Sequence, residues 1–183
     1  LIIGGGVCGC SLLYELSRYK VNVLLVEKEN DVSLGTTKAN SAIVHAGYDP
    51  QPGTKMARYN VEGNALVKEL CEKLDVPYKQ IGSLVLAFDG EQMQTVDELF
   101  HRGNRNGVPG LRVLSPEEVW AMEPNVSKEV KSALYAPTAA VVSPWELAIA
   151  QAETAVKNGA QVKLNSPVTA IEKTEQGFRV TAG

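Results

Sequence analysis

The sequence has little of what would indicate a membrane, a nucleic acid or an oxidising compartment. No apolar run approaches the roughly 18 residues that a membrane-spanning helix needs, so we expect no transmembrane segment. A net charge of -3 and the lack of a long basic tract argue against a nucleic-acid partner. Three cysteines make a poor disulfide framework, which favours the reducing cytoplasm.

Metal ligands, targeting signals and internal repeats are missing as well. Cys8 and Cys10 stand close together, but no second ligand pair accompanies them. On a helix their side chains point about 200° apart, so we expect core-filling residues and no metal. Because the chain opens directly on a strand, we expect no signal peptide. Three residues before the first glycine are few for a central strand, and we expect a fragment of a longer protein.

The most informative stretch is the opening of the chain. An apolar run, Leu1–Ile3, enters the turn Gly4-Gly5-Gly6-Val7-Cys8-Gly9, which is followed by a helical pattern over Val7–Tyr19. A second apolar run then ends at Glu27, 18 residues after Gly9. This order predicts a strand, a tight turn, a helix and a parallel strand, with a dinucleotide bound across them.

Each residue of this pattern has a physical task. Gly4 permits the tight turn, Gly6 lets the backbone approach a pyrophosphate, and Gly9 lets the helix pack closely on the strand. The N-terminus of the helix offers free N–H groups and partial positive charge to the phosphates. The carboxylate of Glu27 can accept hydrogen bonds from both hydroxyls of an adenosine ribose and would disfavour a 2′-phosphate.

A polar stretch follows from Lys28 and contains Gly35-Thr36-Thr37-Lys38-Ala39-Asn40-Ser41. Its hydroxyls and amides could bind a second phosphate or the ribityl chain of a flavin, or could simply cap a solvated loop. His45 then interrupts a short apolar segment. It is either a hydrogen-bonded structural residue or a base with a pKa near neutrality.

The remainder of the chain alternates helices and strands without a linker. Apolar spacing and turn residues predict helices over 54–75, 91–106, 116–123 and 145–158, and strands over 82–88, 131–136, 161–164, 168–173 and 178–181. We expect Leu66, Leu70 and Leu74 to share one face of the long helix. The stretch from about residue 76 to 137 breaks the early alternation, so it is predicted to be inserted.

Three blocks together resemble the D-amino-acid-oxidase-like superfamily of FAD-dependent oxidoreductases. They are Gly4–Gly9 with Glu27, the run from Gly35 to Gly47 that ends in His45-Ala46-Gly47, and Asn165-Ser166-Pro167-Val168. Within that superfamily the chain is similar to the glycerol-3-phosphate dehydrogenases and oxidases and to the L-2-hydroxyglutarate oxidases. The resemblance implies an α/β fold, a Rossmann-like FAD-binding domain of the glutathione-reductase type with an inserted α+β substrate-domain segment. The FAD-binding domain would comprise residues 1–75 and 138–183, and the inserted segment residues 76–137.

The resemblance also implies roles for particular residues. FAD would contact Gly4, Gly6, Gly9, Glu27, Lys28, Thr36, Thr37, Asn40, Ser41 and the main chain of Val168, and His45 would be the catalytic base. The implied reaction oxidises the secondary alcohol of a small anion, sn-glycerol 3-phosphate to dihydroxyacetone phosphate. L-2-Hydroxyglutarate oxidation, or the reaction of another flavoenzyme of the superfamily, is the alternative.

Other readings stay open at this point. The glycine turn alone also fits an NAD-dependent dehydrogenase, although the second polar block is not required there. A non-catalytic nucleotide-binding module is a further alternative. The residues do not determine the electron acceptor, which could be oxygen, a quinone or an iron–sulfur partner. We expect a cytoplasmic protein, and the residues do not decide whether it associates peripherally with a membrane.

Overall fold

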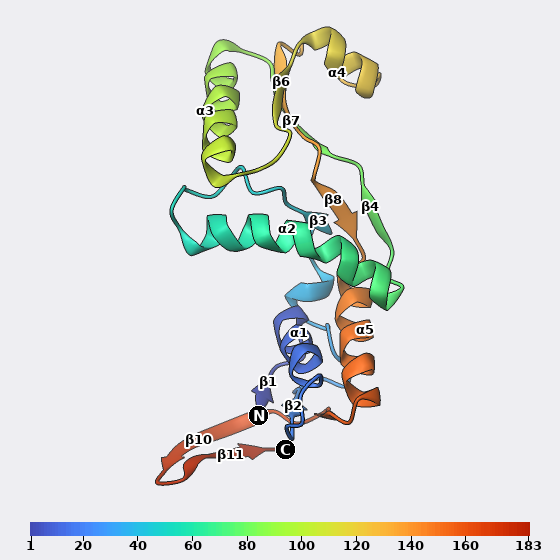
Figure 1. Cartoon of the computed structure of the whole chain (residues 1–183), viewed down its shortest axis with the longest axis vertical. Helices are drawn as coiled ribbons and strands as arrows, with labels where there is room; N and C mark the ends of the chain where they lie inside the picture. The colour runs from blue at the N-terminus through green and yellow to red at the C-terminus, as the bar shows by residue number, and fades with distance from the viewer. The chain divides into compact units, whose positions relative to one another are not determined.

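The computed structural model describes all 183 residues and divides into two compact units. The first unit contains residues 1–42, 73–77 and 143–183, and the second contains residues 43–72 and 78–142. The helices are α1 (Val7–Leu16), the 3₁₀ turn η1 (Thr36–Lys38), α2 (Lys55–Leu74), α3 (Gly90–Asn106), α4 (Pro116–Met122) and α5 (Pro144–Lys157) (Figure 1). The strands are β1 (Ile2–Ile3), β2 (Leu24–Val26), β3 (Ile43–Val44), β4 (Tyr78–Gln80), β5 (Ser83–Ala87), β6 (Arg112–Leu114), β7 (Ser132–Ala136), β8 (Ala140–Val142), β9 (Gln161–Lys163), β10 (Val168–Thr174) and β11 (Gly177–Ala182).

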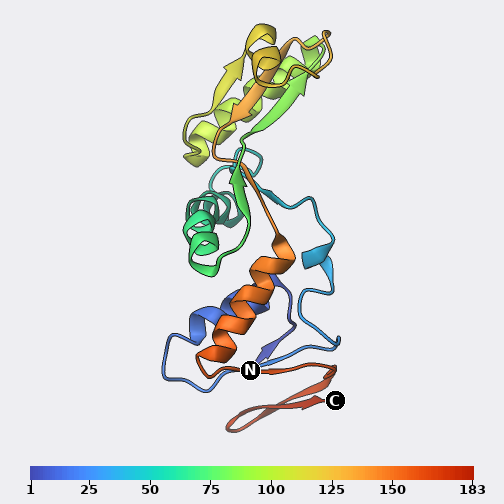
Figure 2. The same ribbon diagram turned by 90° about the vertical axis from the view of Figure 1, so that its right-hand side faces the viewer.

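The first unit is built on a parallel sheet with strand order β1-β2-β9. Helix α1 follows β1, helix α5 precedes β9, and the two helices pack side by side (Figure 2). Leu13 of α1 and Leu25 of β2 are fully buried in a cluster with Ala155 of α5. The predicted order of strand, turn, helix and parallel strand is confirmed, because Ile2 pairs with Leu25 in parallel register.

The same unit ends in an antiparallel hairpin of β10 and β11. The sequence predicted this hairpin with strands one or two residues shorter. Its strands are joined at Gly177, whose positive φ of 138° is readily adopted only by glycine.

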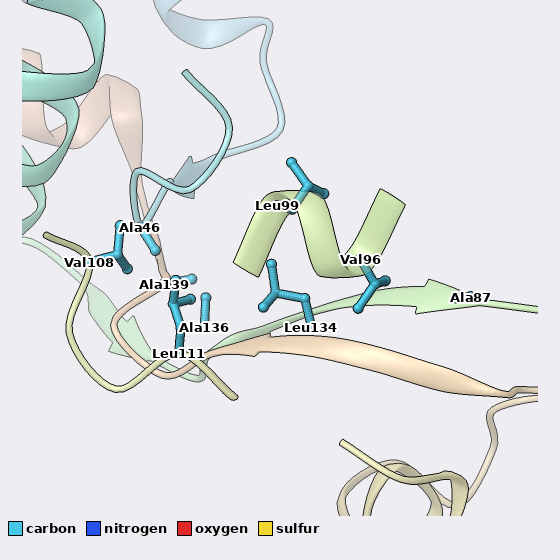
Figure 3. Packing of buried hydrophobic residues seen from close by; sticks show 9 residues of the cluster. All are labelled: Ala46, Ala87, Val96, Leu99, Val108, Leu111, Leu134, Ala136 and Ala139. Atoms are coloured by element: carbon cyan, nitrogen blue, oxygen red, sulfur yellow. The ribbon is translucent and has the colours of Figure 1, made fainter. Parts of the chain in front are cut away.

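The second unit contains two antiparallel sheets, with strand orders β3-β8-β4 and β5-β7-β6. Helix α3 packs on β5 and β7, and Figure 3 shows Val96 and Leu99 of α3 beside Leu134 of β7. Helix α4 begins with the predicted capping box, in which the Ser115 hydroxyl accepts from the Glu118 N–H and the Glu118 carboxylate accepts from the Ser115 N–H.

Several sequence expectations need correction. The first helix ends at Leu16, before the predicted Tyr19, because the chain turns there. Leu66 is 64% exposed, and the buried residue on that part of α2 is Cys71. Apart from these corrections, residues 43–72 group with the second unit, whereas the family resemblance implies that they belong to the FAD-binding domain. The domain boundaries that it implies stay a prediction. No helix in the structure combines the length and the apolar character needed to cross a bilayer.

Candidate functional site

The glycine turn lies between β1 and α1 and has the close packing that its spacing predicts. The Gly4 N–H donates to the carbonyl oxygen of Val26 at 2.8 Å, and Gly4 has a φ of 99°, in the region that favours glycine. A Cβ at Gly9 would lie 1.9 Å from the Gly4 carbonyl oxygen, a separation that atoms cannot adopt. Gly9 therefore allows α1 to begin directly against the end of β1.

Glu27 follows β2, and the residue is 9% exposed. Its Oε2 accepts a hydrogen bond from the Gly5 N–H at 2.5 Å, and its Oε1 accepts one from the Glu29 N–H at 2.9 Å. Burial opposes the charged form, but the N–H groups of Gly5, Glu29 and Lys28 outweigh it, so the pKa of Glu27 is lowered. Each oxygen keeps a second lone pair that can accept from a ligand hydroxyl.

The segment from Thr36 to Ser41 lies against the glycine turn. The Thr37 side chain is buried, and its Oγ1 accepts from the Val7 N–H at 2.9 Å. It therefore caps α1 in place of Gly6, which has no side chain. Asn40 holds the turn itself together, since its Nδ2 donates to the Thr37 carbonyl oxygen at 2.7 Å. Thr36 and Ser41 are exposed beside this turn.

A cavity of about 250 Å³ opens at the end of the parallel sheet. It is lined by Ile3, Gly4, Val26, Glu27, Lys28, Ser166, Pro167 and Val168. Four of the residues predicted from the sequence to bind the cofactor thus share one pocket. Ser166 and Pro167 were not predicted, although they directly precede Val168 in one of the blocks that carry the family resemblance.

These residues fit a dinucleotide. The first turn of α1 contains no acidic residue, and its N-cap Gly6 offers no side-chain acceptor to the N–H groups that a helix N-terminus leaves free. The Cβ position of Gly4 has no neighbour within 4 Å, so the turn is open to a close ligand. A diphosphate can bind at such an N-terminus, while the ionised Glu27 suits ribose hydroxyls in the adjoining cavity.

His45 lies in the second unit, directly after β3, and its side chain is exposed. Its carbonyl oxygen accepts a hydrogen bond from Asn64 Nδ2 at 3.1 Å. The imidazole is therefore accessible to solvent, while its backbone carbonyl is held by the Asn64 side chain. The sequence did not predict the contact with Asn64, because the two residues lie 19 positions apart.

All 183 residues match the family model of the FAD dependent oxidoreductases (DAO), and the chain belongs to this family. It is 54% identical over 179 residues to a glycerol 3-phosphate dehydrogenase of Caloramator mitchellensis, covering 98% of this chain and 37% of that protein. It is 30% identical to the human mitochondrial L-2-hydroxyglutarate dehydrogenase, covering 96% of this chain and 38% of the relative.

The structure is similar to that of the L-α-glycerophosphate oxidase of Mycoplasma pneumoniae, solved in dithionite-reduced form with FAD bound. The TM-score is 0.95 at 34% sequence identity, over 100% of this chain and 48% of that one. The mixed α/β fold is thus that of an FAD-dependent oxidoreductase. The chain spans less than half the length of each of these three relatives.

Proposed function

We propose that this chain supplies a Rossmann-like FAD-binding domain of the glutathione-reductase type, together with part of a substrate domain, to a flavoenzyme. Gly4, Gly6 and Gly9 would admit the pyrophosphate to the N-terminus of α1, and Glu27 would accept from the adenosine ribose. The observation that supports this assignment is the shared cavity of Gly4, Glu27, Lys28 and Val168 beside that N-terminus. Thr36, Thr37, Asn40 and Ser41 would continue the site toward the flavin.

The substrate we propose is sn-glycerol 3-phosphate, oxidised to dihydroxyacetone phosphate. The 54% identity to the Caloramator glycerol 3-phosphate dehydrogenase supports this choice. L-2-Hydroxyglutarate is the second candidate, supported by the 30% identity to the human enzyme. Both are small anions with a secondary alcohol, and in either case the alcohol loses two hydrogens to become a ketone.

His45 is the residue we propose as the base that takes the hydroxyl proton. Its imidazole is exposed on an anchored backbone, and histidine is the side chain that most often acts as a general base. Bound FAD would supply the acceptor for the hydride. The chain would orient the substrate and exclude water from the reacting groups.

The decisive experiment compares His45→Gln with His101→Gln in the full-length holoenzyme. His101 is exposed on α3 and is the other histidine of the chain, so it is a matched control. Flavin reduction is followed anaerobically after mixing with sn-glycerol 3-phosphate or with L-2-hydroxyglutarate. We expect H45Q to slow reduction on the order of 10²–10⁴-fold and H101Q to leave it within twofold. An H45Q rate within about twofold of the parent removes His45 from the chemistry.

The electron acceptor and the location of the enzyme are part of the same proposal. We place the enzyme in the cytoplasm, with oxygen, a quinone or an iron–sulfur partner as its oxidant. Reoxidation of the reduced holoenzyme by dissolved oxygen, compared with reoxidation by a soluble quinone, distinguishes an oxidase from a dehydrogenase. Co-sedimentation with lipid vesicles tests a peripheral membrane association.

A further inference from the structure

The backbone segment that carries His45 is held at both ends by asparagine side chains. Asn64, in the middle of α2, donates from Nδ2 to the carbonyl oxygens of His45 (3.1 Å) and Thr138 (2.9 Å). Asn106, the last residue of α3, donates from Nδ2 to the carbonyl oxygens of Gly47 (2.9 Å) and Pro50 (2.8 Å). An amide NH₂ group has two hydrogens, so each asparagine uses both of them on this segment and its neighbours.

Asn64 acts where a strand pairing stops. The last pair of strands β3 and β8 is Val44 with Ala140; His45 lies one residue and Thr138 two residues beyond it. The β3–β8 hydrogen bonds no longer hold the chain at these positions, where the bond to His45 is exposed and the bond to Thr138 is half-buried. The side chain of Asn64 donates to both carbonyls and thereby links the two segments beyond the end of the strand pairing.

The residues after His45 are fixed by packing. Ala46 is buried in the core of the second unit (Figure 3). Gly47 has a φ of 107°, and a Cβ there would lie 2.6 Å from the side chain of Val61. The imidazole of His45 is thus an exposed group on a segment that has little freedom to move.

We propose that Asn64 is a positioning residue for His45. By holding the His45 carbonyl it fixes the peptide plane, and with it the direction in which the imidazole leaves the backbone. This inference rests on the proposed role of His45 as the base in alcohol oxidation. A displacement of about 1 Å at a catalytic group can lower the rate about 10²-fold. We therefore expect His45 to act more slowly as a base when the hydrogen bond from Asn64 is missing.

The first test measures the positioning without substrate. Asn64→Ala removes both hydrogen bonds, and Asn64→Asp keeps the size but brings a carboxylate against two carbonyl oxygens. Asn104→Ala is the matched control, because Asn104 bonds only the Phe100 carbonyl within α3. In the full-length holoenzyme we expect faster hydrogen exchange over residues 43–50 in both Asn64 variants, with FAD content and exchange over residues 1–42 unchanged. Exchange over residues 43–50 equal to that of the parent overturns the proposal.

The second test asks whether Asn64 acts through His45. We expect N64A to slow anaerobic flavin reduction about 10- to 10²-fold in the parent enzyme. Adding N64A to H45Q should slow reduction by less than twofold, because the group that Asn64 positions is already gone. Equal slowing in both backgrounds indicates a merely structural role and overturns the proposal.

The kinetics of the parent enzyme and of H45Q show whether the proposed function fails, independently of the role of Asn64. If neither substrate reduces the flavin of the parent enzyme, or if H45Q reduces it at the parent rate, the proposed function is wrong, and so is a catalytic purpose for the positioning. The exchange measurement still decides whether Asn64 holds the segment. An exchange pattern equal to that of the parent, together with the expected slowing of flavin reduction in H45Q by about 10²–10⁴-fold, refutes the role of Asn64 and leaves the proposed function standing.

Discussion

Replacement of Glu27 by glutamine tests the part of the site that the structure describes most sharply. The carboxylate accepts from the backbone N–H groups of Gly5 and Glu29, and the residue as a whole is 9% exposed. Glutamine keeps one acceptor oxygen and turns an NH₂ group toward the other N–H, so one charge-assisted bond is lost and one buried donor is left unpaired. Hydrogen bonds to charged groups contribute about 1.5–3 kcal/mol, so we expect Glu27→Gln to lower the free energy of unfolding by about 2–4 kcal/mol.

The measurement is urea unfolding of the full-length apoprotein at pH 7, followed by titration of FAD into the folded variant. Glu15→Gln is the matched control, since Glu15 forms only an exposed pair with Arg18, and such pairs contribute about 0–1 kcal/mol. We expect weaker FAD binding by E27Q and parent-like binding by E15Q. If E27Q unfolds within about 0.5 kcal/mol of the parent, the backbone hydrogen bonds at Glu27 do not hold the turn as we describe.

The pH dependence of stability gives a second check on Glu27. Its pKa in the folded state is lowered from the ordinary value of about 4.5 by the backbone N–H groups that donate to the carboxylate. The unfolded state therefore binds the proton more readily, and the stabilisation is complete above about pH 4.5 and lost as the pH falls through the lower folded pKa. We expect E27Q to lack this part of the acid destabilisation, as measured by urea unfolding between pH 3 and pH 7.

Three further variants or reagents test the surroundings of the turn. Gly9→Ala would place a Cβ 1.9 Å from a backbone oxygen, so we expect the free energy of unfolding to fall by about 3 kcal/mol or more. Gly63→Ala is the control, because Gly63 lies in α2 with open space around its Cβ position, and it should be neutral or stabilising. Thr37→Val removes the cap of α1 and should cost about 1 kcal/mol and weaken FAD binding in a fluorescence titration; unchanged values for both would refute that role. Iodoacetamide at pH 8 should label the exposed Cys8 of the apoprotein and spare Cys10, because burial and then the charges of Glu27 and Asp31 raise the pKa of Cys10 to about 11. Mass spectrometry should show slower labelling of Cys8 once FAD is bound, and equal rates would place FAD elsewhere.

Local patterns predicted much of the fold correctly. The glycine turn, the capped helices and the C-terminal hairpin follow from periodicities and turn residues within a few positions of each other. Strands β4, β6 and β8 were not predicted, because three residues carry no alternation and their partners lie far away in the chain. Leu66 matched a helical stripe, yet Leu66 is exposed and the buried residue on that part of α2 is Cys71. Periodicity identifies an apolar stripe but does not say which stripe is covered.

The candidate site also has a part that local sequence patterns predict and a part that depends on contacts between distant residues. The spacing from Gly4 to Gly9 and on to Glu27 predicted one half of it, because strand, turn and helix geometry is local. The contact between Thr37 and the Val7 N–H crosses 30 residues, and only the family resemblance indicated that the two segments belong together. The hydrogen bonds of Asn64 cross 19 and 74 residues and carry no sequence signal, since asparagine in a helix is ordinarily a surface residue.

The central claim is that the glycine turn, Glu27 and the segment from Thr36 to Ser41 hold an FAD that oxidises a small anionic alcohol. The most direct measurement is the absorbance of the purified full-length protein at about 450 nm, a flavin band, before and after anaerobic addition of sn-glycerol 3-phosphate. We predict a yellow protein whose band is bleached by this substrate. A colourless protein that takes up no FAD, or a flavin band unchanged by both sn-glycerol 3-phosphate and L-2-hydroxyglutarate, would contradict the account.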